Sequence, residues 1–390
     1  MRSLRDKLDA LNKPRKAPAS PPPGEREARA LFSRETVYPL SQLWELEKTS
    51  LEEVLSCDPY FTGSRWNLDD LLFVDTETTG LNGGAGTIAF EIGIGKMVGD
   101  HLRITQYVLS GYDQEEQMLR AVAGCFTDNT IVVSFNGKIF DLPLLQSRMI
   151  LNRIHAPLTA YPHLDLMHVS RRVYRRRLRR CNLSSVEEAA LGLVREDDLP
   201  GAQVPERFFS YLRTGQFEHI EPVLRHNLQD VLSLAQLTGA LCAAFRHPEQ
   251  LEHDEDVLSI GRTLQRTGRA EKARTCYRIV GARHLRSEGH LYLAMHCKKE
   301  KDWEETVRLC QEMIRRHENG SWPHLQMAMY CEHHLRDARA ALRYAETALE
   351  IEGQRQALGA DRQKEIHSLF ARLRRLRRKI MKETERENTP

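Results

Sequence analysis

Long hydrophobic runs are missing from this chain of 390 residues. No apolar stretch approaches the roughly 20 residues that a membrane-spanning helix needs, so we expect no membrane partner. The N-terminus also lacks the apolar segment of a secretory signal. It is rich in proline and charged residues instead, which is typical of a disordered tail, here placed at residues 1–32.

Cysteine pairs at metal-binding or redox spacing are also absent. The eight cysteines are scattered, no two form a CxxC motif, and none has a histidine at zinc-finger spacing. This argues against a disulfide framework or a structural zinc and suits a reducing compartment, so we expect a cytoplasmic protein. The net charge is only +3, so nucleic-acid binding can be indicated only by local clusters of charge.

The length exceeds what one ordinary hydrophobic core organises and predicts two domains with tails. Hydrophobic residues make up 41% and charged residues 28%, which is ordinary for a globular protein. After the tail we expect an N-terminal extension at 33–69 with a helix within 39–55, an α/β domain at 70–247, helical repeats at 256–352 and a basic helix at 361–383.

Strand and helix patterns alternate in the α/β domain. Gly99 and Asp100 join two β-rich runs, which predicts an antiparallel hairpin. A capping box from Ser184 to Glu187 and a stop at Gly192 predict a short helix. Strands are predicted at 71–77, 86–98, 102–110, 130–135 and 163–169, and the other helices at 114–126, 140–154 and 222–241. This order predicts the α/β class.

The second half of the chain repeats itself. The segments LSIGRTL at 258, LYLAMHC at 291 and LQMAMYC at 325 recur at intervals of 33 and 34 residues. The following segments recur in step: one column holds Ala273, Thr306 and Ala341, and another holds Tyr277, Cys310 and Ala345. A period near 34 residues with paired helices matches the tetratricopeptide repeat, although the usual Trp, Gly and Tyr positions are mostly replaced.

Two acids directly follow a predicted buried strand, in LLFVDTETTGL at 71–81. Side chains alternate along a strand, so Asp75 and Glu77 face one way and Thr76 the other. Neighbouring carboxylates at the end of an apolar strand repel each other and are poorly solvated. A divalent cation such as Mg²⁺, which prefers oxygen ligands, removes both problems. The alternative is that the strand ends at Val74 and both acids are solvated.

Further acids come from two other segments. Asp141 follows the strand predicted at 130–135, at the start of a helix. His226 and Asp230 lie four positions apart on the helix predicted at 222–241, so they share one helix face. Four acids from three elements, each able to reach one end of the sheet, predict a metal site. The alternative for His226 is an ordinary surface histidine.

The segments FVDTETTGL, FNGKIFD and HNLQD resemble the three motifs of the DEDD, or DnaQ-like, superfamily of 3′–5′ exonucleases, which has a ribonuclease-H-like fold. Within it, GGAGTIAFEIGIG, HLDL, LPGAQVP and RHNLQDV resemble the bacterial YprB-type domain, which is often followed by tetratricopeptide repeats. The resemblance covers roughly residues 70 to 240. It implies a mixed five-stranded sheet with flanking helices, and nucleic acid, as single strands or 3′ ends, as the substrate.

The resemblance also implies roles. Asp75 would bridge two divalent cations, Mg²⁺ or Mn²⁺, and Glu77, Asp141 and Asp230 would complete the ligand set. His226 would accept a proton from the attacking water, which suits the pKa of histidine, ordinarily about 6.5. The backbone of Thr78, Thr79, Gly80 and Leu81 would lie against the terminal nucleotide, with Leu81 as a wedge.

One feature departs from the superfamily. Its members use histidine with four residues before the last aspartate, or tyrosine with three, whereas His226 has the tyrosine spacing. A nuclease fold that has lost catalysis and serves as a scaffold is therefore a second hypothesis, with the repeats binding a protein partner. An endonuclease on the same fold is a third.

Seven arginines lie between Arg171 and Arg180. Beside a phosphodiesterase site they would follow a phosphate backbone, with Arg171, Arg172 and Arg175 as contacts and Tyr174 stacking on a base. The alternative is a solvated helix face. In the second motif, Asn136 and Phe140 are candidate substrate contacts, and a core role for Phe140 is the alternative.

Overall fold

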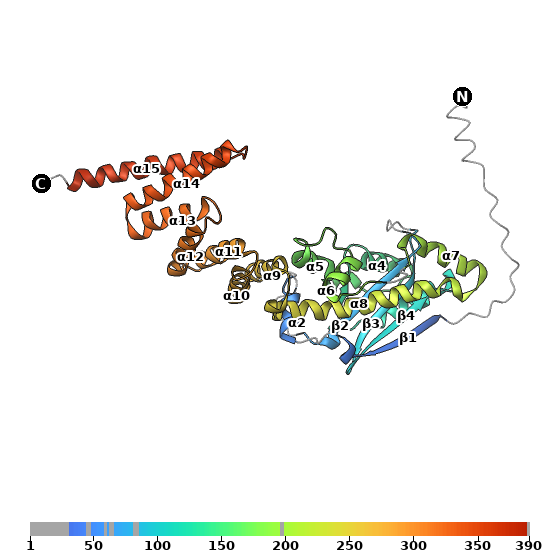
Figure 1. Cartoon of the computed structure of the whole chain (residues 1–390). Helices are drawn as coiled ribbons and strands as arrows, with labels where there is room; N and C mark the ends of the chain where they lie inside the picture. The colour runs from blue at the N-terminus through green and yellow to red at the C-terminus, as the bar shows by residue number, and fades with distance from the viewer. Residues whose placement is uncertain are drawn as a thin grey trace, which may run out of the picture.

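The computed structural model describes residues 31–43, 48–57, 61, 66–80, 86–195 and 199–387. A sheet with helices on both faces is followed by an arc of helices that leads to the C-terminus (Figure 1). The predicted α/β domain and all-helical second half are confirmed. The predicted tail lies outside the described residues, except for Leu31 and Phe32.

The sheet is mixed, as predicted, but it has six strands rather than five, in the order β1-β4-β3-β2-β5-β6. The first three pairs in that order are antiparallel, and β2, β5 and β6 are parallel. The hairpin turns at Gly99, which has a left-handed backbone (φ 60°). The strands are β1 (Phe32–Pro39), β2 (Leu71–Thr78), β3 (Ala89–Val98), β4 (His101–Val108), β5 (Ile131–Ser134) and β6 (His163–Asp165).

The additional strand is β1, so the assignment of Phe32 to a disordered tail is wrong. β1 is an edge strand that pairs only with β4, and its exposed positions alternate with half-buried ones. Charged side chains and a final proline are typical of protected edge strands, and they hide the strand signal in the sequence. The helix predicted within 39–55 is shorter than expected, because Pro39 ends β1 and α2 covers only Lys48–Leu55.

Helices cover both faces of the sheet, and the side chains of β2 point alternately to one face and the other. Phe73 packs in the cluster that contains α8 (Glu221–Arg246), whereas Leu72 and Val74 pack against the opposite helices. The α8 face also holds α2, α5 (Leu166–Tyr174) and α6 (Leu183–Leu191). The opposite face holds α3 (Glu115–Ala123), α4 (Asp141–Leu151) and α7 (Val204–Thr214). Asp75 and Glu77, in register with Phe73, are thereby directed toward α8.

The helix α8 runs across the sheet and connects the two parts of the chain (Figure 1). By length and composition alone it could cross a membrane, but 67% of its most apolar window is buried inside the protein. Its side chains pack on β2, β3, β4 and α2. We therefore describe α8 as the core helix of the sheet domain.

The helix α6 ends at Gly192 as predicted, with a left-handed backbone (φ 67°). The predicted capping box is wrong, because Asn182 occupies the N-cap and no side chain caps the helix. The carboxylate of Glu187 binds Arg195 instead.

The second half forms helix pairs at the predicted period. The side chains of both predicted columns are buried: Ala273, Thr306 and Ala341 in one, and Tyr277, Cys310 and Ala345 in the other. Each helix packs on the next, as in a stacked repeat array. The helices are α9 (Asp254–Arg266), α10 (Ala270–Gly281), α11 (Arg286–Lys299), α12 (Trp303–Arg315), α13 (Trp322–Tyr330), α14 (Ala338–Ala357) and α15 (Gln363–Glu387).

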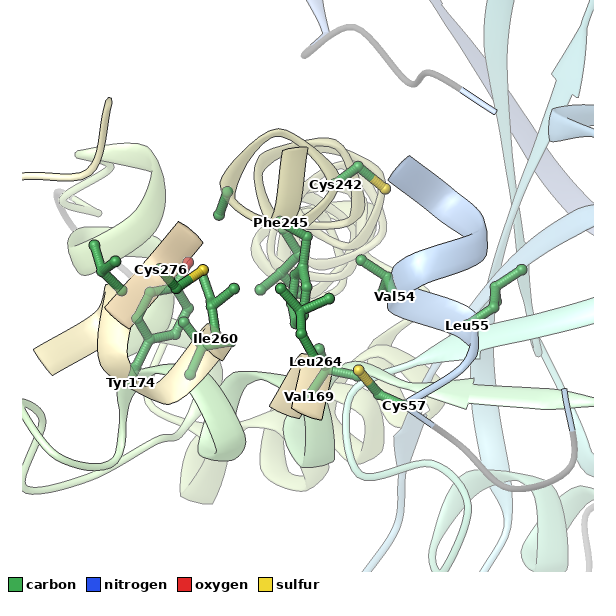
Figure 2. Packing of buried hydrophobic residues seen from close by; sticks show 14 of the residues in the cluster. Val54, Leu55, Cys57, Val169, Tyr174, Cys242, Phe245, Ile260, Leu264 and Cys276 are labelled. Carbon is green, nitrogen blue, oxygen red and sulfur yellow. The ribbon is translucent and has the colours of Figure 1, made fainter. Parts of the chain in front are cut away.

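The two halves share one hydrophobic core. Phe245 on α8 lies among side chains of α2, α5 and α9, including Val54, Val169 and Leu264 (Figure 2). Buried Asp256 on α9 accepts two hydrogen bonds from Arg177, at 3.0 and 2.8 Å. The contact fixes α9 against α5, so the start of the helical region is packed on the sheet domain.

Candidate active site

Asp75 and Glu77 lie at the end of β2 and face α8. In the antiparallel pairing, Asp75 is opposite Gly93 and Glu77 is opposite Glu91 of β3. A Cβ atom at position 93 would lie 2.2 Å from Oδ1 of Asn227. The missing side chain of Gly93 therefore allows α8 to approach the two acids closely.

The third motif meets the first at this strand end. His226 Nε2 lies 3.7 Å from Glu77 Oε1 and 3.7 Å from Asp230 Oδ2. His226 and Asp230 are one turn apart on α8 and only partly exposed. The tyrosine-like spacing thus directs the histidine ring into the acid cluster.

Asp141 is the first residue of α4 and is only 6% exposed. The hydroxyl of Thr76, which faces away from Asp75 and Glu77, donates to Asp141 Oδ1. Burial, helped by nearby Asp165 and Asp230 and opposed by the Thr76 hydrogen bond, raises the pKa of Asp141 to about 6. The second motif therefore reaches the cluster from the other face of the sheet.

The four predicted acids lie close enough together for their charges to repel one another. Burial raises the pKa of Asp75 well above its ordinary value, and Asp230, Asp141 and Glu77 add to this effect. Burial also raises the pKa of Asp230, while His226 and Arg195 oppose it. Several buried carboxylates without matching charge are costly unless they are protonated or bound to cations.

A chain of amide side chains, which the sequence analysis missed, holds Asp75. Asn227 Nδ2 donates to Asp75 Oδ2 at 2.9 Å, and Asn227 Oδ1 accepts from Gln106 Nε2 at 3.2 Å. Gln106 also donates to buried Glu91 at 2.8 Å, and Arg34 of β1 donates to Gln106. The local signal was one acid, Glu91, within the apolar first half of β3.

Arg195 is the second feature that the sequence analysis missed. Its NH2 atom lies 2.6 Å from Asp230 Oδ1 and 2.5 Å from Oε1 of Glu187, which is 0% exposed. The guanidinium therefore joins a fully buried acid to a predicted metal ligand. No local pattern could have shown the contact with Asp230, because Arg195 follows α6 whereas Asp230 lies on α8.

The donor chemistry fits divalent metal ions. Mg²⁺ and Mn²⁺ prefer carboxylate oxygens, which are offered here by Asp75, Glu77, Asp141 and Asp230. A bound cation would also reduce the repulsion between these acids. Within the described residues, no three acid, histidine or cysteine side chains are already arranged as a metal-ligand set. An ion bound by Asp230 would have to compete with its present cationic partner Arg195.

The loop before Asp141 is held by Asp165. Asp165 Oδ1 accepts from the backbone N–H of Asn136 at 2.9 Å, and Oδ2 accepts from that of Lys138 at 3.3 Å. Asn136 has a left-handed backbone (φ 70°), which these hydrogen bonds stabilise. Asp165 therefore positions the second motif.

The predicted substrate contacts have mixed outcomes. Thr78, Thr79 and Gly80 form a tight turn at the site, in which the Thr78 hydroxyl donates to Gly80 O at 2.9 Å. Leu81 lies outside the described residues. The prediction that Tyr174 is available for stacking is wrong, because its ring is 3% exposed in the core. Four further candidates remain accessible: Phe140 is half-buried, and Arg171, Arg172 and Arg175 are exposed.

Comparison with known proteins agrees with the fold. Residues 72–242 match the RNase H superfamily model. The chain is 30% identical over 362 residues to YprB of Bacillus subtilis (strain 168), an uncharacterized protein, and the match covers 89% of this chain and 85% of YprB. The fold suggests a nuclease that binds nucleic acid. The chain therefore belongs to the RNase H superfamily, in the same family as YprB.

Proposed function

We propose that this protein is a metal-dependent 3′–5′ exonuclease. The observation that carries the proposal is the convergence of Asp75, Glu77, Asp141 and Asp230 with His226 at one end of the sheet. The order and type of these residues match the three motifs of DEDD exonucleases. Two Mg²⁺ or Mn²⁺ ions held by the acids would stabilise the charge that develops on the phosphodiester oxygens.

The chain's own residues would prepare the reaction. Asn227 orients Asp75, and Asp165 holds the loop that carries Asp141. His226 Nε2 lies 3.7 Å from a carboxylate oxygen of Glu77 and 3.7 Å from one of Asp230, where it would accept the proton of the attacking water. The turn at Thr78–Gly80 would contact the terminal nucleotide.

The activity can be tested with end-labelled single strands and Mg²⁺ or Mn²⁺. We expect stepwise shortening from the 3′ end and no cleavage of a circular strand. Asp75→Ala and Asp141→Asn should abolish the activity. Cleavage of the circle would indicate an endonuclease, and equal degradation by wild type and Asp75→Ala would exclude this site.

The role of His226 needs a separate test because of its spacing. General bases contribute about 10²- to 10⁴-fold, so His226→Ala should lose that much turnover while still binding metal. His226→Tyr places the superfamily's other residue at its usual spacing and should retain more activity than His226→Ala. Full activity in both variants would assign the proton transfer to another group.

One observation supports a second candidate, a nuclease fold that binds nucleic acid without cleaving it. Arg195 forms an ion pair with Asp230, which would keep a metal ion from binding to this carboxylate. Calorimetry distinguishes the two: a scaffold would bind no divalent ions, whereas binding that disappears in Asp141→Asn supports the nuclease. The eight cysteines are free thiols, so we propose a reducing compartment such as the cytoplasm for either function.

A further inference from the structure

Two adjoining hollows lie beside the active-site loop. The first has a volume of about 720 Å³ and is lined by Phe135 and Asn136 of that loop and by arginines of and after α5. The second, of about 450 Å³, lies between α5 and α9. Both are lined by Arg171 and Arg175, so they form one continuous groove from the acid cluster's loop to the helical region.

The groove is lined by cations without acids. From the nuclease side it contains Arg171, Arg172, Arg175, Arg176, Arg179 and Arg180, and α9 adds Arg262 and Arg266. Among the described residues, no acidic side chain lines either hollow, and no ion pair engages Arg171, Arg175 or Arg266, whereas Arg176 pairs with Glu288 outside the hollows. Several positively charged side chains that line a concave surface without acidic neighbours in it attract a polyanion.

The arginines of α9 are held in place by the shared core. Helices α5 and α9 pack directly on each other, with Ile260 and Leu264 of α9 beside Val169 and Tyr174 of α5 (Figure 2). The ion pair of Arg177 with Asp256 fixes the same contact. The two walls of the groove are therefore aligned before any ligand binds, which lowers the entropic cost of binding.

We infer that this groove binds the sugar-phosphate backbone of single-stranded nucleic acid, with α9 of the helical region forming one wall. The inference rests on the proposed function, because it names the path of the same substrate. A guanidinium group can bind a phosphate with two parallel N–H···O hydrogen bonds. The buried Met167 and the half-buried Leu178 supply apolar surface beneath them. Continuity with the loop that carries Asp141 favours nucleic acid over an acidic peptide.

The test compares two matched pairs of arginines. Arg262→Ala with Arg266→Ala removes the α9 wall. Arg339→Ala with Arg343→Ala removes two exposed arginines at the same spacing on α14, remote from the groove in sequence. Circular dichroism checks that each variant is folded. Because Arg262 stacks on Tyr292 at 5.4 Å, the exposed Arg266 is also tested alone as Arg266→Glu.

Binding is measured by fluorescence anisotropy in EDTA, with labelled oligonucleotides of about 4 to about 16 nucleotides, the range of known single-strand sites. For the longest strand we expect about tenfold weaker binding in the α9 pair and unchanged binding in the α14 pair. The slope of log K against log salt should fall by about 1.4 for two lost phosphate contacts. For the shortest strand, the α9 pair should match wild type.

Equal binding of the longest strand by wild type, the α9 pair and Arg266→Glu would overturn the inference. Stronger binding of a polyglutamate peptide than of the oligonucleotide would assign the groove to an acidic protein instead. Since EDTA prevents metal-dependent cleavage, binding without any nuclease activity would refute only the proposed function. Cleavage with no effect of the α9 arginines would refute only the groove.

Discussion

Arg195 lies 2.6 Å from Asp230 and 2.5 Å from fully buried Glu187, and thus links the third motif to the connection after α6. A cation at this place stabilises the acid cluster in the absence of metal. In the proposed nuclease it would also compete with a metal ion for the carboxylate of Asp230. We therefore expect Arg195 to couple metal binding to folding stability.

Replacing Arg195 by methionine should destabilise the metal-free protein by about 3–5 kcal/mol, because buried Glu187 loses its counter-charge. The added negative charge at Asp230 should also increase the thermal shift produced by Mn²⁺. Denaturation with and without Mn²⁺ measures both effects. Adding Glu187→Gln should recover part of the stability, and an unchanged Mn²⁺ shift would contradict the competition.

The metal-free protein should become less stable as the pH rises toward neutrality, because of Asp141. Burial raises the pKa of this acid to about 6 from 3.8. Between these values the folded state binds more protons than the unfolded state, so the free energy of unfolding falls with rising pH. Asp141→Asn should therefore be more stable than wild type at pH 8, by the order of 1–3 kcal/mol.

Thermal denaturation in EDTA at pH 5 and pH 8 checks this prediction. The fall in stability between the two pH values should be smaller in Asp141→Asn than in wild type. Mn²⁺ at pH 8 should stabilise wild type, whose carboxylate ligands are then deprotonated. It should not stabilise Asp141→Asn, which lacks one of these carboxylates. The raised pKa of Asp141 would be contradicted if wild type in EDTA gained stability relative to Asp141→Asn as the pH rises.

Asn227→Ala should weaken metal binding without removing a ligand. The side chain is fully buried and donates to Asp75 at 2.9 Å. Loss of such an orienting hydrogen bond typically costs about 10- to 100-fold in metal affinity, and the unpaired groups about 1–3 kcal/mol of stability. Calorimetric titration with Mn²⁺ measures the affinity. Gln229→Ala, which removes a hydrogen bond to Ser233 on the same helix, is the control and should bind Mn²⁺ like wild type.

Two neighbouring arginines should differ in their contribution to the contact between the two halves. Arg177 pairs with buried Asp256, so Arg177→Ala leaves a charge buried and should cost about 3–5 kcal/mol. Arg176 pairs with Glu288 at the surface, so Arg176→Ala should cost about 0–1 kcal/mol. Urea denaturation measures both, and hydrogen exchange should show faster opening of α9 in Arg177→Ala only. Equal effects would show that the buried pair does not hold α9.

The sequence alone determined the features that depend on local periodicity. Alternation along 71–78 placed Asp75 and Glu77 on one side, and the spacing of His226 and Asp230 placed them on one helix face. The 33- and 34-residue period located the helix pairs, in which the side chains of the two predicted columns are buried. In each case neighbours in the chain carry the information.

Only the tertiary structure decided the contacts between distant segments. The charged edge strand β1 becomes a strand because β4 offers it hydrogen-bonding groups. Arg195 reaches Asp230, and Asn227 reaches Asp75 and Gln106, because the fold brings α8 beside β2, β4 and the connection after α6 and buries these polar groups together. The arginines of α9 join those of α5 because one hydrophobic core extends across both halves of the chain.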